Sequence, residues 1–250
     1  MAVGHAAALA PAVEMRHISV MEIHIDSLLD GARRATGSVA IIDVFRAFTT
    51  AAVALANGAA RIIMVASVEE ALALRAAGAG QICMGEVGGR APPGFDFGNS
   101  PFAIAEHDFA GATIIQRTGA GTQGITAARQ AERLYAAALV TADATARALK
   151  AGAPERITLV AMGNSAIVRT DEDELCAIHL RHLLEGRAGD REALRRTILS
   201  GGEIAQFGDP AHPHMPAGDL DIALDIGRYD FAIRVTLEDG RPVGRREDPA

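Results

Sequence analysis

Residues 38–59, SVAIIDVFRAFTTAAVALANGA, predict a strand followed directly by a helix. The first seven, SVAIIDV, form a short apolar run of the kind that fills a buried strand. The alanine-rich segment behind them ends at Asn57-Gly58, a pair that is typical of the end of a helix. A strand that passes straight into a helix is the repeating unit of α/β proteins, so this stretch indicates the fold class.

The same alternation continues along the chain. Further strands are predicted at RIIMVA, QICMGE, GATIIQR, LYAAALV, ERITLVAMG and YDFAIRVTL. Helices are predicted at SVEEALALRAAGAG, ITAARQAERL, TADATARALKAG and DEDELCAIHLRHLLEG, and within residues 190–207 and 217–227. We therefore predict a three-layer α/β/α fold with a largely parallel or mixed central sheet. Residues 16–242 are expected to form a single domain, between a flexible N-terminus at 1–15 and a polar tail at 243–250.

The composition argues against two kinds of partner. A formal charge of −7 over 250 residues disfavours nucleic acid, because proteins that bind it gather lysine and arginine on one face. No run approaches the roughly 20 apolar residues of a membrane span. The cysteines, Cys83 and Cys176, are too far apart for a metal motif or a small disulfide framework. We expect a cytoplasmic protein with no nucleic-acid or membrane partner, and a homodimer as its assembly.

Charged residues follow two of the predicted strands at the edge where α/β proteins bind ligands. Asp43 ends the first strand, Arg46 lies three residues on, and Glu86 follows QICM. Two carboxylates there suit magnesium, which prefers a few oxygen ligands, and an arginine can fork onto a phosphate or sulfonate. The alternative for Asp43 and Arg46 is a helix cap with an internal ion pair, and for Glu86 an exposed loop position.

The turn TGAGT, residues 118–122, joins a predicted strand to a helix and offers backbone N–H groups to an anion. Gly119, Gly121 and Gly124 also match the bare spacing G-x-G-x-x-G. The match comes midway through the predicted sheet, and no acidic strand end follows about 20 residues later, which argues against a dinucleotide site.

The glycine- and proline-rich loop at residues 87–101 is too long for a simple connection. Its stretch GFDFGNSP places Asn99 and Ser100 as donors at the start of a predicted helix, FAIAEH. Later in the chain, His212-Pro213-His214 has the composition of either a metal-binding pair or an exposed loop.

Taken together, IIDVFRAFTTAAVALANGA, MGEVGGRAPPGFDFGNSP, TIIQRTGAGTQGI and DEDELCA resemble the 2-phosphosulfolactate phosphatase family. The resemblance covers residues 38–176 and weakens towards residues 219–240. It implies an α/β phosphatase that uses magnesium (Mg2+) and removes phosphate from 2-phosphosulfolactate, leaving sulfolactate, in the coenzyme M pathway.

The family's site residues carry over by position. The implied catalytic residues are Asp43, Arg46 and Glu86, and the implied magnesium ligands are Asp43, Glu86 and Asp173. The implied substrate-binding residues are Arg46, Asn99, Ser100, Arg117, Thr118, Gly121 and Thr122. Family members commonly read TTTNGTRAI where this chain has RTGAGTQGI, so Gln123 replaces an arginine. Either Arg117 restores the charge, or the substrate is another phosphate ester.

The expected function is therefore magnesium-dependent hydrolysis of a small anionic phosphate monoester, with 2-phosphosulfolactate as the first candidate. Phe45 stands where haloacid dehalogenase phosphatases carry their second aspartate, which favours an activated water over attack by Asp43. The rival functions are a phosphatase for a different ester, a non-catalytic protein that binds an anionic metabolite, and a nicotinamide oxidoreductase.

Overall fold

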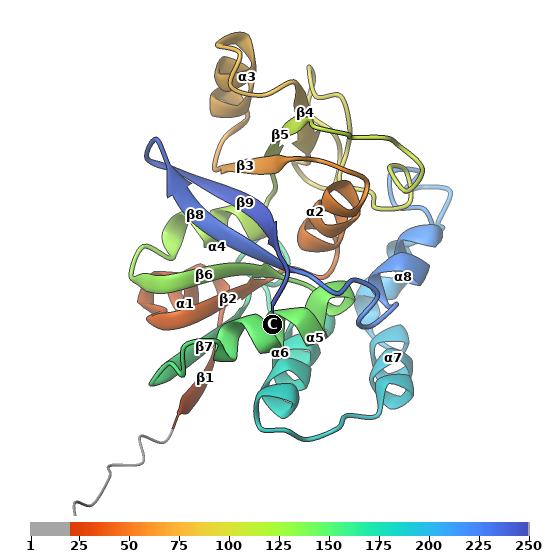
Figure 1. Cartoon of the computed structure of the whole chain (residues 1–250). Coiled ribbons are helices and arrows are strands. Elements are labelled where there is room, and N and C mark those ends of the chain that lie inside the picture. The colour runs from red at the N-terminus through yellow and green to blue at the C-terminus, as the bar shows by residue number, and fades with distance from the viewer. Residues whose placement is uncertain (1–20, 250) are drawn as a thin grey trace, which may run out of the picture.

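The computed structural model describes residues 21–249, and within them nine strands form one sheet (Figure 1). The order across the sheet is β1-β7-β2-β6-β8-β9-β3-β5-β4. The strands are β1 (Glu22–Ser27), β2 (Gly37–Ile42), β3 (Arg61–Val65), β4 (Ile82–Gly85), β5 (Thr113–Arg117), β6 (Ala131–Ala137), β7 (Arg156–Ala161), β8 (Ala232–Glu238) and β9 (Arg241–Glu247).

Helices cover both faces of this sheet, which confirms the predicted three-layer α/β/α fold with a mixed, largely parallel sheet. They are α1 (Leu28–Arg34), α2 (Ala47–Ala56), α3 (Val68–Ala76), α4 (Gly121–Ala127), α5 (Ala142–Lys150), α6 (Asp171–Leu184), α7 (Arg191–Leu199) and α8 (Gly218–Ala223). Two short 3-10 helices, η1 (Leu139–Thr141) and η2 (Gly202–Gln206), complete the set within the described residues.

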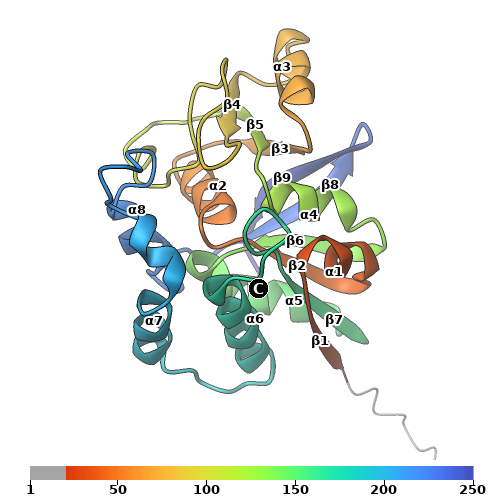
Figure 2. The same cartoon turned by 180° about the vertical axis from the view of Figure 1, so that it is seen from behind.

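The period-2 alternation of a strand divides the core into layers. In β2, Val39 and Ile41 pack with α1, α2 and α4, whereas Ala40 and Ile42 pack with α5 and α6 on the opposite face. Helices α5 and α6 contact each other, and both lie below β2 and β6 in Figure 2. Because both faces are buried, β2 consists of small and apolar residues, which is why its sequence predicts a strand so clearly.

The sheet consists of two parallel groups that run in opposite directions. Strands β1, β7, β2 and β6 are mutually parallel, as are β3, β5 and β4. Between the groups lies the antiparallel hairpin β8–β9, which pairs with β6 on one side and β3 on the other. Helix α2 also connects the groups, since it leads from β2 to β3.

Several local expectations are corrected. The predicted polar tail at 243–250 is wrong, because residues up to Glu247 belong to β9 inside the sheet. The predicted helix ITAARQAERL is shorter: α4 ends at Ala127, and AERL enters β6. FAIAEH forms turns instead of a helix. The expected flexible segment 1–15 lies outside the described residues. No helix between residues 21 and 249 is long and apolar enough to cross a membrane.

Candidate active site

A polar cavity of about 410 Å³ lies where strands of both parallel groups end. Its walls come from the segments that follow β2, β4, β5 and β7, from the start of α6, and from residues 203–215. A larger hollow of about 1060 Å³ lies between α4 and the β8–β9 hairpin, but none of the predicted site residues lines it. The smaller cavity therefore matches the position that α/β proteins use for their ligands.

Asp43 enters the cavity directly after β2 and is almost fully buried. Its Oδ1 accepts a hydrogen bond from the Ala47 N–H at 3.0 Å, in the first turn of α2, which agrees with the helix-cap half of the alternative interpretation. The ion pair of that alternative is not formed, because Arg46 pairs with Asp219 instead. Burial raises the pKa of Asp43 to about 6, with the charge of Glu86 adding to the rise and hydrogen bonds from Ala47 and Gly121 opposing it. A cation beside Asp43 would relieve this cost of ionisation.

Glu86 lies across the cavity, after β4, and its carboxylate is fixed by two backbone donors. Its Oε2 accepts from the Gly89 N–H at 2.7 Å, and its Oε1 accepts from the Gly119 N–H. The Arg117 side chain donates to the Glu86 carbonyl at 2.6 Å. Glu86 is thus held in place from its backbone and its side chain, as a preorganised ligand requires.

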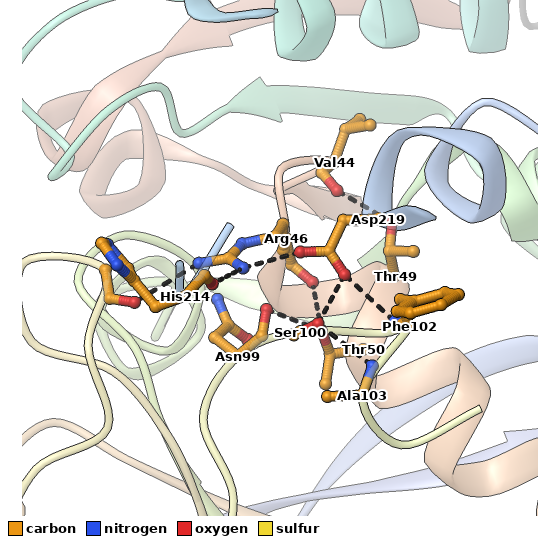
Figure 3. A network of polar contacts seen from close by, with 11 residues as sticks. Val44, Arg46, Thr49, Thr50, Asn99, Ser100, Phe102, Ala103, His214 and Asp219 are labelled. Carbon is orange, nitrogen blue, oxygen red and sulfur yellow. Dashed lines mark hydrogen bonds and ion pairs between the residues drawn. The ribbon is translucent and has the colours of Figure 1, made fainter. Parts of the chain in front are cut away.

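Arg46 is the best-anchored cation of the cavity (Figure 3). Its Nη1 donates to the Asp219 carboxylate and to the His214 carbonyl, each at 2.7 Å. The two side chains of the ion pair are only 3% and 0% exposed, so solvent screens it little. Asp219 also accepts from the Ser100 hydroxyl at 2.6 Å, and this network fixes the guanidinium at the cavity wall.

The acidic end of the cavity continues at the start of α6. Glu172 lines the cavity, and burial raises its pKa to about 7, with the charges of Glu203 and Asp43 adding to the rise. Asp173 points elsewhere: its two oxygens accept from the backbone N–H groups of Val44 and Gly163 at 2.7 and 2.8 Å. We therefore revise Asp173 from a magnesium ligand to a brace between the ends of β2 and β7.

The structure brings four of the predicted site residues to the cavity wall: Asp43, Arg46, Glu86 and Asn99. Asn99 is 6% exposed, and its Oδ1 has no partner among the described residues. A buried carbonyl oxygen without a donor is costly, so this atom is available to a ligand or water.

The other predicted substrate-binding residues lie behind the wall. Thr118 and Thr122 exchange hydrogen bonds with each other, which starts α4 one turn earlier than the sequence predicts. A side chain on Gly121 would lie 2.9 Å from Asp43 Oδ2, so only glycine fits there. Ser100 and Arg117 are engaged with Asp219 and with the Glu86 carbonyl. These five residues support the site without lining it.

The sequence interpretation missed several residues that do line the cavity. Arg90 was not singled out, and His212 and His214 were considered only as a metal pair or an exposed loop, but all three line the cavity. The sequence indicates a loop at Val87–Pro101 and another at His212-Pro213-His214, but nothing in it indicates that the two loops meet. The exposed-loop alternative holds in part, because the His212 side chain is 39% exposed, whereas Nδ1 of His214 is buried.

The donor set suits magnesium. In the part of the chain described, no three His, Cys, Asp or Glu side chains are grouped closely enough to enclose a metal ion. Magnesium, however, is commonly held through one or two carboxylates together with waters and substrate phosphate. Asp43 and Glu86 can supply those carboxylates, and the unpartnered Asn99 oxygen lies in the same wall.

The fold and the cavity together define an α/β protein with a polar ligand site, formed from carboxylates and fixed cations at the ends of its strands. Comparison with known proteins is more specific. Residues 23–202 match the family model described as 2-phosphosulpholactate phosphatase, and the chain belongs to this family, as the resemblance of its motifs predicted.

Individual relatives agree with that assignment. A probable 2-phosphosulfolactate phosphatase of Deinococcus radiodurans is 35% identical over 182 residues, which cover 71% of this chain and 74% of the relative. One of Bacillus subtilis is 30% identical over 211 residues, or 82% of this chain and 90% of the relative. One of Synechococcus is 38% identical over 149 residues, covering 58% and 60% of the two chains.

Proposed function

We propose that this protein is a magnesium-dependent phosphatase that hydrolyses 2-phosphosulfolactate to sulfolactate and phosphate, the type of reaction used in coenzyme M biosynthesis. The observation that carries the proposal is the convergence of Asp43, Glu86 and Arg46 on one polar cavity. Two carboxylates for a divalent cation and a fixed arginine for a phosphoryl oxygen are the groups that phosphoryl transfer requires. Family membership supports the same reaction.

In this proposal, Asp43 and Glu86 hold Mg2+, which when bound neutralises phosphoryl oxygens and lowers the pKa of a water molecule. The backbone hydrogen bonds to both carboxylates keep them in position, so little reorganisation is needed at the moment of reaction. Nη1 of Arg46 is engaged by Asp219 and His214, and Nη2 donates to the Gly89 carbonyl at the long distance of 3.4 Å. The Nε of Arg46 and the remaining N–H of Nη2 are the donors for the substrate anion.

Asp43 acts as a ligand in this scheme, and water is the nucleophile. Its carboxylate already accepts a hydrogen bond from the Ala47 N–H, which favours its charged form and reduces its nucleophilicity. Asn99 lies close enough to the same space to orient a water molecule through its unpartnered Oδ1.

The test is phosphate release from 2-phosphosulfolactate and a small panel of phosphate esters, with magnesium and with EDTA. We expect release only with magnesium, and a loss of about 100-fold or more in kcat for Asp43→Asn. Asp30→Asn, at an exposed position on α1, is the matched control and should behave as wild type. Undiminished hydrolysis by Asp43→Asn would refute its assigned role.

Phosphate release from another ester but not from 2-phosphosulfolactate would support phosphatase activity with a different substrate. Tight binding of an anionic metabolite without any turnover would indicate that the protein binds such a metabolite and is not a phosphatase. The cytoplasmic location and the homodimer stay predictions. Cell fractionation checks the location, and light scattering coupled to size-exclusion chromatography checks the homodimer.

A further inference from the structure

The cavity is basic at the end formed by Arg46, Arg90 and His214, and the reaction proposed above does not account for Arg90 and His214. Both side chains line the cavity next to Arg46. Arg90 is exposed, and within residues 21–249 its side chain has no hydrogen-bond or ion-pair partner. The Nδ1 of His214 is buried and has no partner there either. The nearby His212 differs, because Asp209 pairs with it at 3.3 Å.

Both basic residues stand on backbone that is held firmly. Arg90 closes a short turn in which it and Val87 exchange backbone hydrogen bonds at 2.9 and 3.2 Å. Glu86 accepts from the Gly89 N–H in the same turn, so one loop presents an acidic and a basic side chain to the cavity. His214 is held through its carbonyl, which accepts from Arg46.

The surroundings of His214 indicate an excess of positive charge. Burial lowers its pKa, and the charges of Arg90, Arg46 and His212 lower it further. Gly89 lies against the ring, where a side chain on residue 89 would come within 3.1 Å of Nε2. An anion at this end would relieve the repulsion between the cations, just as a cation would at the acidic end.

The changed turn at residues 117–123 does not supply this positive charge. Gln123 bonds to the Ala66 carbonyl and lines the larger hollow, and Arg117 donates to the backbone of Glu86 and Ala66. Neither side chain reaches the cavity. The cationic side chains available to a second anionic group of a ligand therefore come from the loops that carry Arg90 and His214.

We infer that Arg90 and His214 bind a second anionic group of the substrate, while its phosphoryl group is bound by Arg46 and by the magnesium that Asp43 and Glu86 would hold. The substrate class is a small phosphate monoester with a carboxylate or sulfonate close to the ester oxygen, a size that suits a cavity of about 410 Å³. This inference rests on the proposed function and adds the residues that select among phosphate esters. An arginine that is free of internal partners suits such an anion, because it can bind it through two parallel hydrogen bonds.

The experiment compares Arg90→Gln and His214→Gln with wild type on three esters. 2-Phosphosulfolactate carries a carboxylate and a sulfonate, 2-phospholactate carries the carboxylate alone, and glycerol 2-phosphate carries neither. We expect Arg90→Gln to raise KM for 2-phosphosulfolactate about tenfold or more and to leave kcat/KM for glycerol 2-phosphate within about twofold. His214→Gln should act in the same direction. Arg129→Gln, at an exposed arginine away from the cavity, is the control.

The pattern across the esters decides the result. An effect on 2-phosphosulfolactate alone assigns the sulfonate to Arg90, and an equal effect on 2-phospholactate assigns the carboxylate. Equal losses on all three esters would overturn the inference while leaving the phosphatase intact. If wild type hydrolyses none of them, the proposed function fails, and calorimetric titration with sulfolactate decides the inference separately. Binding that weakens about tenfold in Arg90→Gln supports it, whereas equal binding by both proteins, or none by wild type, refutes it.

Discussion

Asp219→Ala removes the carboxylate that holds Arg46 in the cavity wall, and we expect it to cost both stability and activity. Asp219 is fully buried and accepts three hydrogen bonds: from Arg46 at 2.7 Å, from the Ser100 hydroxyl at 2.6 Å and from the Phe102 N–H at 3.0 Å. Its removal leaves a buried guanidinium without a counter-charge, although the His214 carbonyl still accepts from it.

The expected magnitude follows from that burial. Breaking a buried ion pair by removing one partner costs about 3–5 kcal/mol, several times the value of an exposed pair. For a chain of this length, each kcal/mol lowers Tm by about 2–4 °C, so the variant should melt about 6–20 °C lower. Asp219→Asn keeps one oxygen acceptor and the side-chain shape, and it should lose less stability than alanine.

The assay is thermal unfolding followed by circular dichroism, together with KM and kcat at a temperature where each variant is folded. Asp221→Ala is the matched control, because Asp221 lies on the same helix but is 79% exposed and only loosely paired with Arg195, at 3.6 Å. A drop of less than about 1 kcal/mol for Asp219→Ala, equal to that of Asp221→Ala, would refute the buried network as a source of stability.

Three further outcomes are expected. Gly121→Ala would bring a methyl group within 2.9 Å of Asp43 Oδ2, so magnesium affinity and kcat should both fall while far-UV circular dichroism stays unchanged. Magnesium at about 100 times its Kd should stabilise wild type by about 2.7 kcal/mol in chemical denaturation, and Asp43→Asn should abolish that gain. Burial lowers the pKa of His179, so the unfolded chain takes up the proton more readily, and stability should decline as pH falls below about 6.5. His179→Gln should flatten this decline in urea titrations, whereas the exposed-site control His24→Gln should not.

A helix or strand could be predicted from the sequence when its own residues determine its conformation, and could not when distant pairing does. Strands such as β2 and β3 are continuous apolar runs, because both faces are buried, and their sequences predict them well. Strand β9, RPVGRRE, contains three arginines, and only Val243 and Gly244 are buried. Its conformation comes from pairing with β8 and β3, which no local pattern indicates.

The candidate site divides in the same way. Asp43, Arg46 and Glu86 follow strands directly, so the topology rule for α/β sheets was enough to place them at the cavity. Arg90 and His214 belong to loops far apart in the sequence, and only the three-dimensional structure shows that these loops meet. The motif around Ser100 and Thr118 was detected, but its side chains turned out to support neighbouring groups instead of facing the ligand space.

The place of β9 between the two parallel groups has a consequence for how the protein is made. The groups are linked within the sheet only through the β8–β9 hairpin, so the sheet stays divided until residues 241–247 have left the ribosome. Until then, β3 and the strand β8 that covers β6 each lack their β9 partner and expose an unpaired edge, which is a template for aggregation. Synthesis that stalls shortly before residue 241 should therefore yield a nascent chain that needs chaperones, even though all of the cavity residues have already been translated.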